Sequence, residues 1–161
     1  MSVDHASRIF IADDHPLVRD ALVQLLTGAG FEVTGGAADG QETLAHPALA
    51  SCRLAIIDLS LGAESGLDLI RRLRILGIAV LVYSMHEESN VIRRAMEAGA
   101  NGYVTKSETA SSLLNAVRAL LAGARIRAGR RAPRPQDRIA GMGAPGVEIA
   151  AALCDRRAAG A

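Results

Sequence analysis

Leu54-Ala55-Ile56-Ile57-Asp58 is a run of four apolar residues that ends on a carboxylate. The turn-forming residues Ser60 and Gly62 follow it, and a short apolar run closed in this way is typical of a buried strand. Strands of parallel sheets are buried on both faces, so their sequences are apolar throughout rather than alternating. We therefore predict a buried strand over residues 54–57, with Asp58 at the carboxyl edge of a parallel sheet. Open α/β folds bind their ligands at that edge.

Four more segments have the pattern of short strands, and helical patterns alternate with all five. These strands are predicted at residues 9–12, 31–34, 78–83 and 102–104. Most of the intervening segments carry apolar residues at helical spacing, and the weakest of them, residues 39–50, is interrupted by Pro47. Five strands alternating with five helices predict an α/β fold, a doubly wound five-stranded parallel sheet with helices on both faces.

The distribution of charge divides the 161 residues into two parts. Residues 1–123 carry ten basic and fourteen acidic side chains, a net charge of −4, whereas residues 124–161 carry eight arginines and three acids, a net charge of +5. A shift of this kind marks a composition boundary. We predict an N-terminal tail over residues 1–7, one domain over residues 8–122, and a tail rich in Arg, Ala, Gly and Pro over residues 123–161.

The sequence has no features of secreted or membrane proteins. Its first residues lack the charged and apolar regions of a signal peptide, and no apolar run approaches the roughly 20 residues of a membrane span. Cys52 and Cys154 form no CxxC pair, and we expect both to be reduced thiols. We expect a soluble cytoplasmic protein without membrane contacts.

Polar side chains follow four of the predicted strands at their carboxyl ends: Asp13 and Asp14, Asp58, Ser84, and Lys106. In a doubly wound sheet with the first strand in the centre, these ends meet at one crevice. Three crowded carboxylates repel one another unless a cation lies among them. Oxygen ligands favour a hard ion, and an incomplete set of ligands favours Mg²⁺ over Ca²⁺.

The hydroxyl of Ser84 and the ammonium of Lys106 are suited to the opposite charge, because both can hold phosphoryl oxygens. Lys106 is also the only lysine of the chain. A carboxylate, a divalent ion, a lysine and a hydroxyl together can accept a phosphoryl group, and aspartyl phosphate is a known type of covalent intermediate.

Residues of about 8–122 resemble the receiver domain of bacterial two-component response regulators, and within these the NarL/FixJ family, which carries a LuxR-type DNA-binding domain. The segments that carry the resemblance are Ile11 to Arg19, Ile57-Asp58-Leu59, Gly66 to Ile70, and Ala95 to Lys106. The resemblance implies a flavodoxin-like fold with the strand order 2-1-3-4-5. Family members often have Met-Pro-Gly shortly after the phosphoacceptor, where this chain has Leu61-Gly62-Ala63.

The resemblance also implies a role for each matching residue. Asp58 is then the phosphoacceptor, and Asp13, Asp14, Asp58 and the backbone carbonyl of Ser60 hold Mg²⁺. Ser84 and Lys106 contact the phosphoryl group, and Tyr103 is the aromatic switch that turns inward when the hydroxyl moves. A sensor histidine kinase is the implied partner, and a homodimer is a second one.

The tail has two interpretations. Its composition is typical of a disordered basic segment, with Arg130 to Pro135 as the part least able to fold. Residues 135–153 alternatively resemble the opening of a LuxR-type helix-turn-helix, of which the recognition helix is absent. Base reading requires that helix in the major groove, so we expect a truncated output region and no sequence-specific DNA binding.

Three functions remain for this chain. The first is a response regulator of a phosphorelay that accepts a phosphoryl group on Asp58 and switches a partner-binding surface, ancestrally to control transcription. The second is a receiver without output, which titrates a kinase or dimerises with full-length regulators. The third is a small aspartate-nucleophile phosphohydrolase, but such enzymes usually place a second acid where Ser60 stands. We therefore expect a phosphoacceptor domain rather than an enzyme.

Overall fold

The computed structural model describes residues 7–61 and 64–123. The predicted tail over residues 1–7, except Ser7, lies outside these ranges. Gly62 and Ala63, which stand where family members often have Pro-Gly, also lie outside these ranges. So do residues 135–153, which resemble the opening of a helix-turn-helix. No helix of the two described ranges is both long enough and apolar enough to span a membrane.

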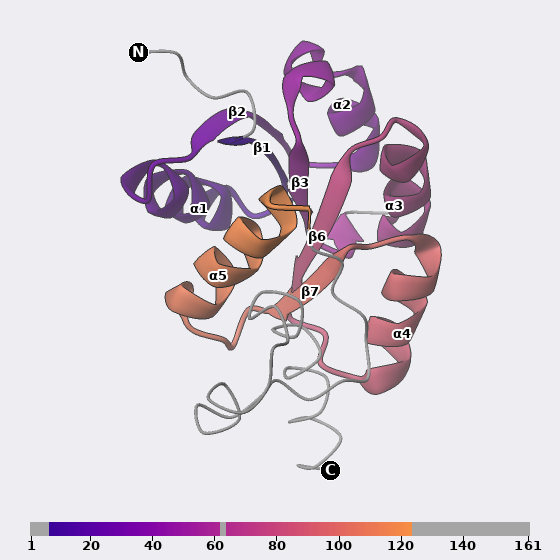
Figure 1. The fold of residues 1–161 in the computed structure, drawn as a ribbon. Helices are drawn as coiled ribbons and strands as arrows, with labels where there is room; N and C mark the ends of the chain where they lie inside the picture. The colour runs from indigo at the N-terminus through magenta and orange to yellow at the C-terminus, as the bar shows by residue number, and fades with distance from the viewer. Residues whose placement is uncertain (1–6, 62–63, 124–161) are drawn as a thin grey trace.

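A five-stranded parallel sheet forms the centre of the structure (Figure 1). Its strands follow the order β2-β1-β3-β6-β7, which is 2-1-3-4-5 when the strands of this sheet are counted along the chain. The predicted doubly wound α/β fold and its strand order are therefore confirmed. The strands are β1 (Arg8–Ala12), β2 (Glu32–Ala37), β3 (Leu54–Ile57), β6 (Ala79–Ser84) and β7 (Gly102–Thr105).

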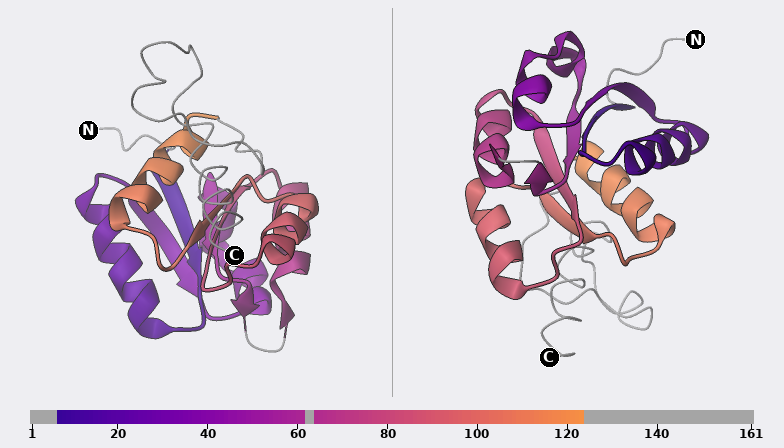
Figure 2. Two further views of the ribbon diagram at one scale, coloured as in Figure 1. Left: turned by 90° about the horizontal axis from the view of Figure 1, so that it is seen from below. Right: turned by 180° about the vertical axis from the view of Figure 1, so that it is seen from behind.

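Helices of the described residues cover both faces of the sheet, as Figure 2 shows from two further sides. α1 and α5 lie on one face, and α2, the 3₁₀ helix η2, α3 and α4 lie on the other. The helices are α1 (Pro16–Gly28), α2 (Gly40–Ala45), η2 (Pro47–Ser51), α3 (Gly66–Ile75), α4 (Ser89–Ala98) and α5 (Ala110–Leu121).

The strands point alternate residues into two apolar cores. In β3, Leu54 and Ile56 pack beneath α1 and α5, whereas Ala55 and Ile57 pack on the side of α2, α3 and α4. All four residues are at most 1% exposed. This two-sided burial is the reason that the strand is apolar at every position.

The second strand begins one residue later and ends three residues later than predicted, because it continues through Gly35 and Gly36. Glycine is depleted in strands, and the sequence pattern therefore ends early. Here the glycine has a packing role: a Cβ at Gly35 would lie 2.7 Å from Cε1 of His46, whose ring packs edge-on against Phe10.

The segment over residues 39–50 forms two short helices, α2 and η2, instead of one. The break falls at His46, which is extended because the next residue is Pro47. A further element was not predicted: β4 (Ser60–Leu61) and β5 (Glu64–Ser65) form a small antiparallel ladder directly after Asp58.

Candidate functional site

The backbone of Asp58 continues from the end of β3. Its N–H donates to the carbonyl of Ala12 at the end of β1, at 2.9 Å, and the residue is 3% exposed. Oδ1 of Asp58 accepts a hydrogen bond from the N–H of Ser60 at 3.2 Å, and Oδ2 accepts one from Nζ of Lys106 at 2.9 Å. The carboxylate is thus fixed at the carboxyl edge of the central strand, as predicted.

Asp13 and Asp14 follow β1 and precede Pro16, the first residue of α1. Asp13 is 2% exposed, and its Oδ1 accepts a hydrogen bond from the N–H of His15 at 2.9 Å. The Asp13 backbone carbonyl accepts a hydrogen bond from Nη1 of Arg19. The side chain of Asp14 is more open to solvent, at 36% exposure.

Lys106 comes directly after β7, and its N–H donates to the carbonyl of Ser84 at the end of β6. Its Nζ lies 2.9 Å from Oδ2 of Asp13 and 2.9 Å from Oδ2 of Asp58. Burial alone would lower the pKa of Lys106, but the hydrogen bonds and the Coulombic attraction of the two carboxylates outweigh burial and raise this pKa. Lys106 therefore remains a cation at neutral pH.

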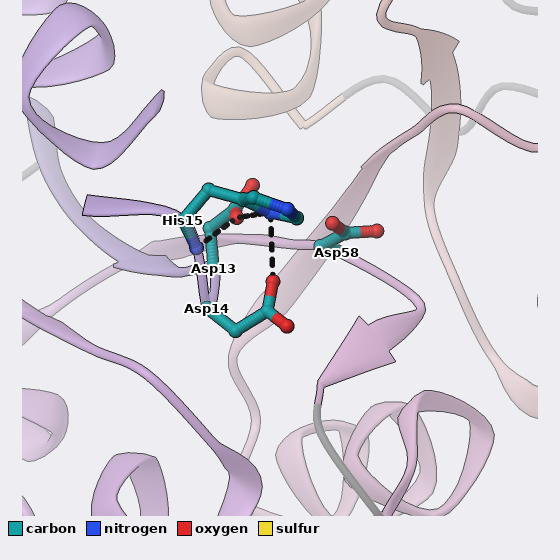
Figure 3. A group of neighbouring side chains, drawn as sticks. All are labelled: Asp13, Asp14, His15 and Asp58. Atoms are coloured by element: carbon teal, nitrogen blue, oxygen red, sulfur yellow. Dashed lines mark hydrogen bonds and ion pairs between the residues drawn. The ribbon is translucent and has the colours of Figure 1, made fainter. Parts of the chain in front are cut away.

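Four side chains offer ligand atoms for a metal ion, namely Asp13, Asp14, His15 and Asp58, as Figure 3 shows. One atom from each lies within 4.8 Å of the others. Three carboxylates and the single ammonium of Lys106 leave a local charge of −2 when His15 is neutral, which a divalent cation balances. The carboxylate oxygens of this donor set fit a hard divalent cation such as Mg²⁺.

Ser84 and Tyr103 both form hydrogen bonds with the backbone of His86. Ser84 is fully buried, and its Oγ accepts a hydrogen bond from the N–H of His86 at 3.2 Å. Tyr103 is 1% exposed, and its hydroxyl donates to the carbonyl of His86 at 2.7 Å. The Tyr103 ring is therefore directed inward in this structure.

Ser60 contacts both groups of site residues, since its N–H donates to Oδ1 of Asp58 and its Oγ lies 3.2 Å from Nε2 of His86. The backbone hydrogen bond from Lys106 to Ser84 joins the two groups a second time. The predicted site residues thus share one edge of the sheet.

His15 and His86 are not among the predicted site residues, although both contact site residues in the structure. Nδ1 of His15 lies 3.1 Å from Oδ1 of Asp13 and 2.8 Å from Oδ1 of Asp14. The only signal for these contacts was position, since His15 follows the acid pair and His86 lies two residues after Ser84.

Gly66 allows the start of α3 to lie against the loop that follows Asp58. A Cβ at this position would lie 2.7 Å from Cα and 2.8 Å from the carbonyl oxygen of Leu59. Both of these are backbone atoms that cannot rotate away, so a larger residue would displace the loop.

Tyr83 adds a contact on the other side of the lysine. Nζ of Lys106 lies 5.9 Å from the centre of the Tyr83 ring, within the range of a cation–π interaction. Burial raises the pKa of the Tyr83 hydroxyl; the nearby Lys106 opposes this shift, and Asp13 adds to it.

The fold and this edge of the sheet define a class of signalling domain, and the comparison with known families agrees. Residues 9–118 match the response regulator receiver domain family. The chain belongs to this family, and the expected resemblance to two-component receivers is confirmed.

The relatives are transcriptional regulators by name. The chain is 39% identical over 119 residues to a putative transcriptional regulator of Pseudomonas aeruginosa, covering 73% of this chain and 58% of that protein. It is 34% identical over 119 residues to the virulence factors putative positive transcription regulator BvgA of Bordetella pertussis, covering 73% of this chain and 57% of that protein. The chain thus spans a little over half the length of these relatives.

Among solved structures, the chain is similar to a two-component response regulator of the LuxR family from Aurantimonas sp. SI85-9A1. The TM-score is 0.70 at 32% identity, and the match covers 94% of this chain and 97% of that one. A CheY-like receiver domain protein from Methanospirillum hungatei matches with a TM-score of 0.63 at 26% identity, covering 73% and 94% of the two chains.

Proposed function

We propose that this receiver accepts a phosphoryl group on Asp58 from the phosphohistidine of a sensor histidine kinase. The observation that carries the proposal is the ammonium of Lys106, which lies 2.9 Å from carboxylate oxygens of both Asp58 and Asp13. A carboxylate so placed can attack phosphorus while the lysine offsets the charge on the phosphoryl oxygens. The P–N bond of the phosphohistidine breaks, the imidazole leaves, and Asp58 becomes an acyl phosphate.

In this proposal Asp13, Asp14, Asp58 and the carbonyl of Ser60 hold Mg²⁺. The bound ion would neutralise charge on the transferred group. Lys106 and the hydroxyl of Ser84 contact the phosphoryl oxygens once they are in place. Since Ser84 accepts a hydrogen bond from His86 and Tyr103 donates to the same residue, a movement of Ser84 is transmitted to Tyr103 through His86.

The proposed signal is a change of partner-binding surface in a regulator of transcription. The names of the relatives support this wider role. We place the receiver at residues 8–122, close to the family match over residues 9–118. The proposal also includes a homodimer and a cytoplasmic location, where the proposed kinase would donate its phosphoryl group. We propose no catalytic turnover beyond loss of the receiver's own phosphoryl group.

Incubation of the full chain with a small phosphodonor and Mg²⁺, followed by intact mass measurement, tests the proposal. We expect one added phosphoryl group that is stable in acid and labile in base, and that is absent from Asp58→Asn. Asp68→Asn is the matched control, because Asp68 is an exposed carboxylate paired with Arg71 on α3. An adduct that persists in Asp58→Asn would contradict the assignment, and turnover of an added phosphoester would favour a phosphohydrolase.

A further inference from the structure

The side chain of His15 lies beside the acid pair Asp13 and Asp14 and has no role in the proposed phosphoryl transfer. Its Nδ1 lies 2.8 Å from Oδ1 of Asp14 and 3.1 Å from Oδ1 of Asp13, and Figure 3 shows the imidazole directed toward these oxygens. The His15 side chain is 62% exposed. The imidazole therefore lies beside the carboxylates and is largely open to solvent.

The position of His15 is fixed by the backbone around it. Its N–H donates to Oδ1 of Asp13 at 2.9 Å, and its carbonyl accepts from the N–H of Arg19 in the first turn of α1. Pro16, the next residue, starts the helix with a restricted φ. The side chain of His15 thus leaves a rigid junction between β1 and α1 on the same side as the acid pair.

The distances between these atoms are those of neighbouring ligands around one ion. Metal–ligand bonds of roughly 2.0–2.1 Å place neighbouring ligand atoms about 3.0 Å apart in an octahedron and about 3.4 Å apart in a tetrahedron. Of the two separations from Nδ1, 3.1 Å lies within this range and 2.8 Å lies just below it. An ion held by both carboxylates therefore also has Nδ1 within bonding reach.

The donor type decides which ions gain from this nitrogen. Mg²⁺ prefers oxygen ligands, whereas imidazole suits zinc and the later first-row transition ions. We propose that His15 is a nitrogen ligand of the cation site, and that it shifts the preference of this site toward zinc-like divalent ions relative to Mg²⁺. This inference rests on the proposed cation site and adds His15 to its ligands.

Ligation by Nδ1 uses the neutral imidazole with its proton on Nε2. The contacts of Nδ1 with the carboxylates of Asp13 and Asp14 are then replaced by bonds from the three atoms to the ion. A simple blocking role for His15 makes a different prediction: a side chain that only covers the acid pair weakens the binding of all divalent ions equally.

Calorimetric titration of the full chain with MgCl₂ and with ZnCl₂ separates these cases. The protein carries Cys154→Ser, so that this thiol does not compete for zinc. His15→Gln keeps an amide oxygen near the acid pair and removes the nitrogen donor. Loss of even an outer-shell partner typically costs ~10–100-fold in metal affinity, so we expect the zinc-to-magnesium affinity ratio to fall at least ~10-fold in this variant.

His46→Gln is the matched control, because it removes an imidazole that has no part in the proposed site. His46 packs against Phe10 at the start of η2, and it is not one of the four residues of the acid and histidine cluster. We expect the affinity ratio of this variant to equal that of the parent protein.

Nitrogen-15 NMR of the imidazole groups gives a second readout that does not depend on phosphorylation. On addition of ZnCl₂, we expect the His15 Nδ1 resonance, assigned by its absence from His15→Gln, to shift while that of His46 stays. An unchanged His15 resonance, or equal strengthening of zinc and magnesium binding in His15→Gln, overturns the inference. Asp13→Asn separates the two proposals. If it abolishes magnesium binding, the proposed cation site is supported even where the role of His15 is overturned. If it changes the binding of neither ion, the cation site and the role of His15 are both overturned.

Discussion

The strand β3 and the residue that follows it are buried to nearly the same degree, yet they are held by different interactions. Leu54 to Ile57 are at most 1% exposed and make apolar contacts on both faces of the sheet. Asp58 is 3% exposed, and its side-chain partners are the ammonium of Lys106 and the N–H of Ser60. Burial alone therefore does not distinguish a core from a site. In the strand it stabilises the fold, and at the strand end it places charges where an added ion or phosphoryl group has a large effect.

The largest effect is expected in the strand itself. Ile56 lies between Ile11 of β1 and Leu81 of β6 in the sheet register and is fully buried. Ile56→Ala removes buried carbon atoms and leaves a cavity, so we expect the free energy of unfolding to fall by about 2–5 kcal/mol. Urea denaturation measures this change. If the variant is still folded, its dissociation constant for Mg²⁺ should equal that of the parent, and a weakened Mg²⁺ site would show that the two parts are coupled.

At the strand end, the expected effect depends on an added ion. Mg²⁺ at about 100 times its dissociation constant should stabilise the folded protein by ~2.7 kcal/mol, because only the folded state brings the carboxylates together. Thermal unfolding with and without MgCl₂ measures this effect. Asp58→Asn keeps the shape and loses the charge, and we expect it to lose most of the stabilisation. Asp68→Asn should retain all of it.

Above neutral pH, the contribution of Lys106 should be lost only in the alkaline range. Its pKa is raised in the folded protein, so its contribution is complete below the unfolded value of roughly 10.4 and is lost as the pH rises through the higher folded value. Lys106→Met should lower the free energy of unfolding by ~1.5–3 kcal/mol at neutral pH, the range for hydrogen bonds to charged groups. Urea denaturation at several pH values tests this prediction. The difference in free energy of unfolding between the parent and Lys106→Met should stay constant from neutral pH to about pH 9. A difference that already becomes smaller in this range would contradict the raised pKa.

The smallest effect is expected at the link between the site and its neighbouring loop. Tyr103→Phe removes the hydrogen bond from the hydroxyl to the carbonyl of His86 and leaves the buried ring in place. We expect a loss of about 0.5–1.5 kcal/mol in the free energy of unfolding. Phosphodonor-driven labelling of Asp58 should keep its rate, since Tyr103 is 1% exposed and bonds to the loop rather than to the carboxylates. A slowed rate would place Tyr103 in the phosphoryl-transfer step.

The strands and the acid cluster could be predicted from sequence because each leaves a strong local signal. Buried parallel strands are apolar at every position, and the polar residues that end them fall at one edge once the topology is known. Asp13, Asp58 and Lys106 come into contact for this reason, although up to 93 residues separate them in the chain.

The contacts of the loops could not be predicted in the same way. The hydrogen bonds of His86 to Ser60, Ser84 and Tyr103 join three loops or strand ends, and no periodicity records such contacts. The end of β2 was missed for a related reason: Gly35 makes room for the ring of His46, a neighbour in space that the strand pattern does not contain.

Both tyrosines lie near the candidate site, and their position has a consequence for optical spectroscopy. Tyr83 lies beside Lys106, and Tyr103 binds the loop after Ser84. The chain has no tryptophan and only these two tyrosines. Its near-ultraviolet absorbance and intrinsic fluorescence therefore come mainly from two rings at the edge of the sheet where the carboxylates gather, and the unlabelled protein carries its own reporters of events at Asp58.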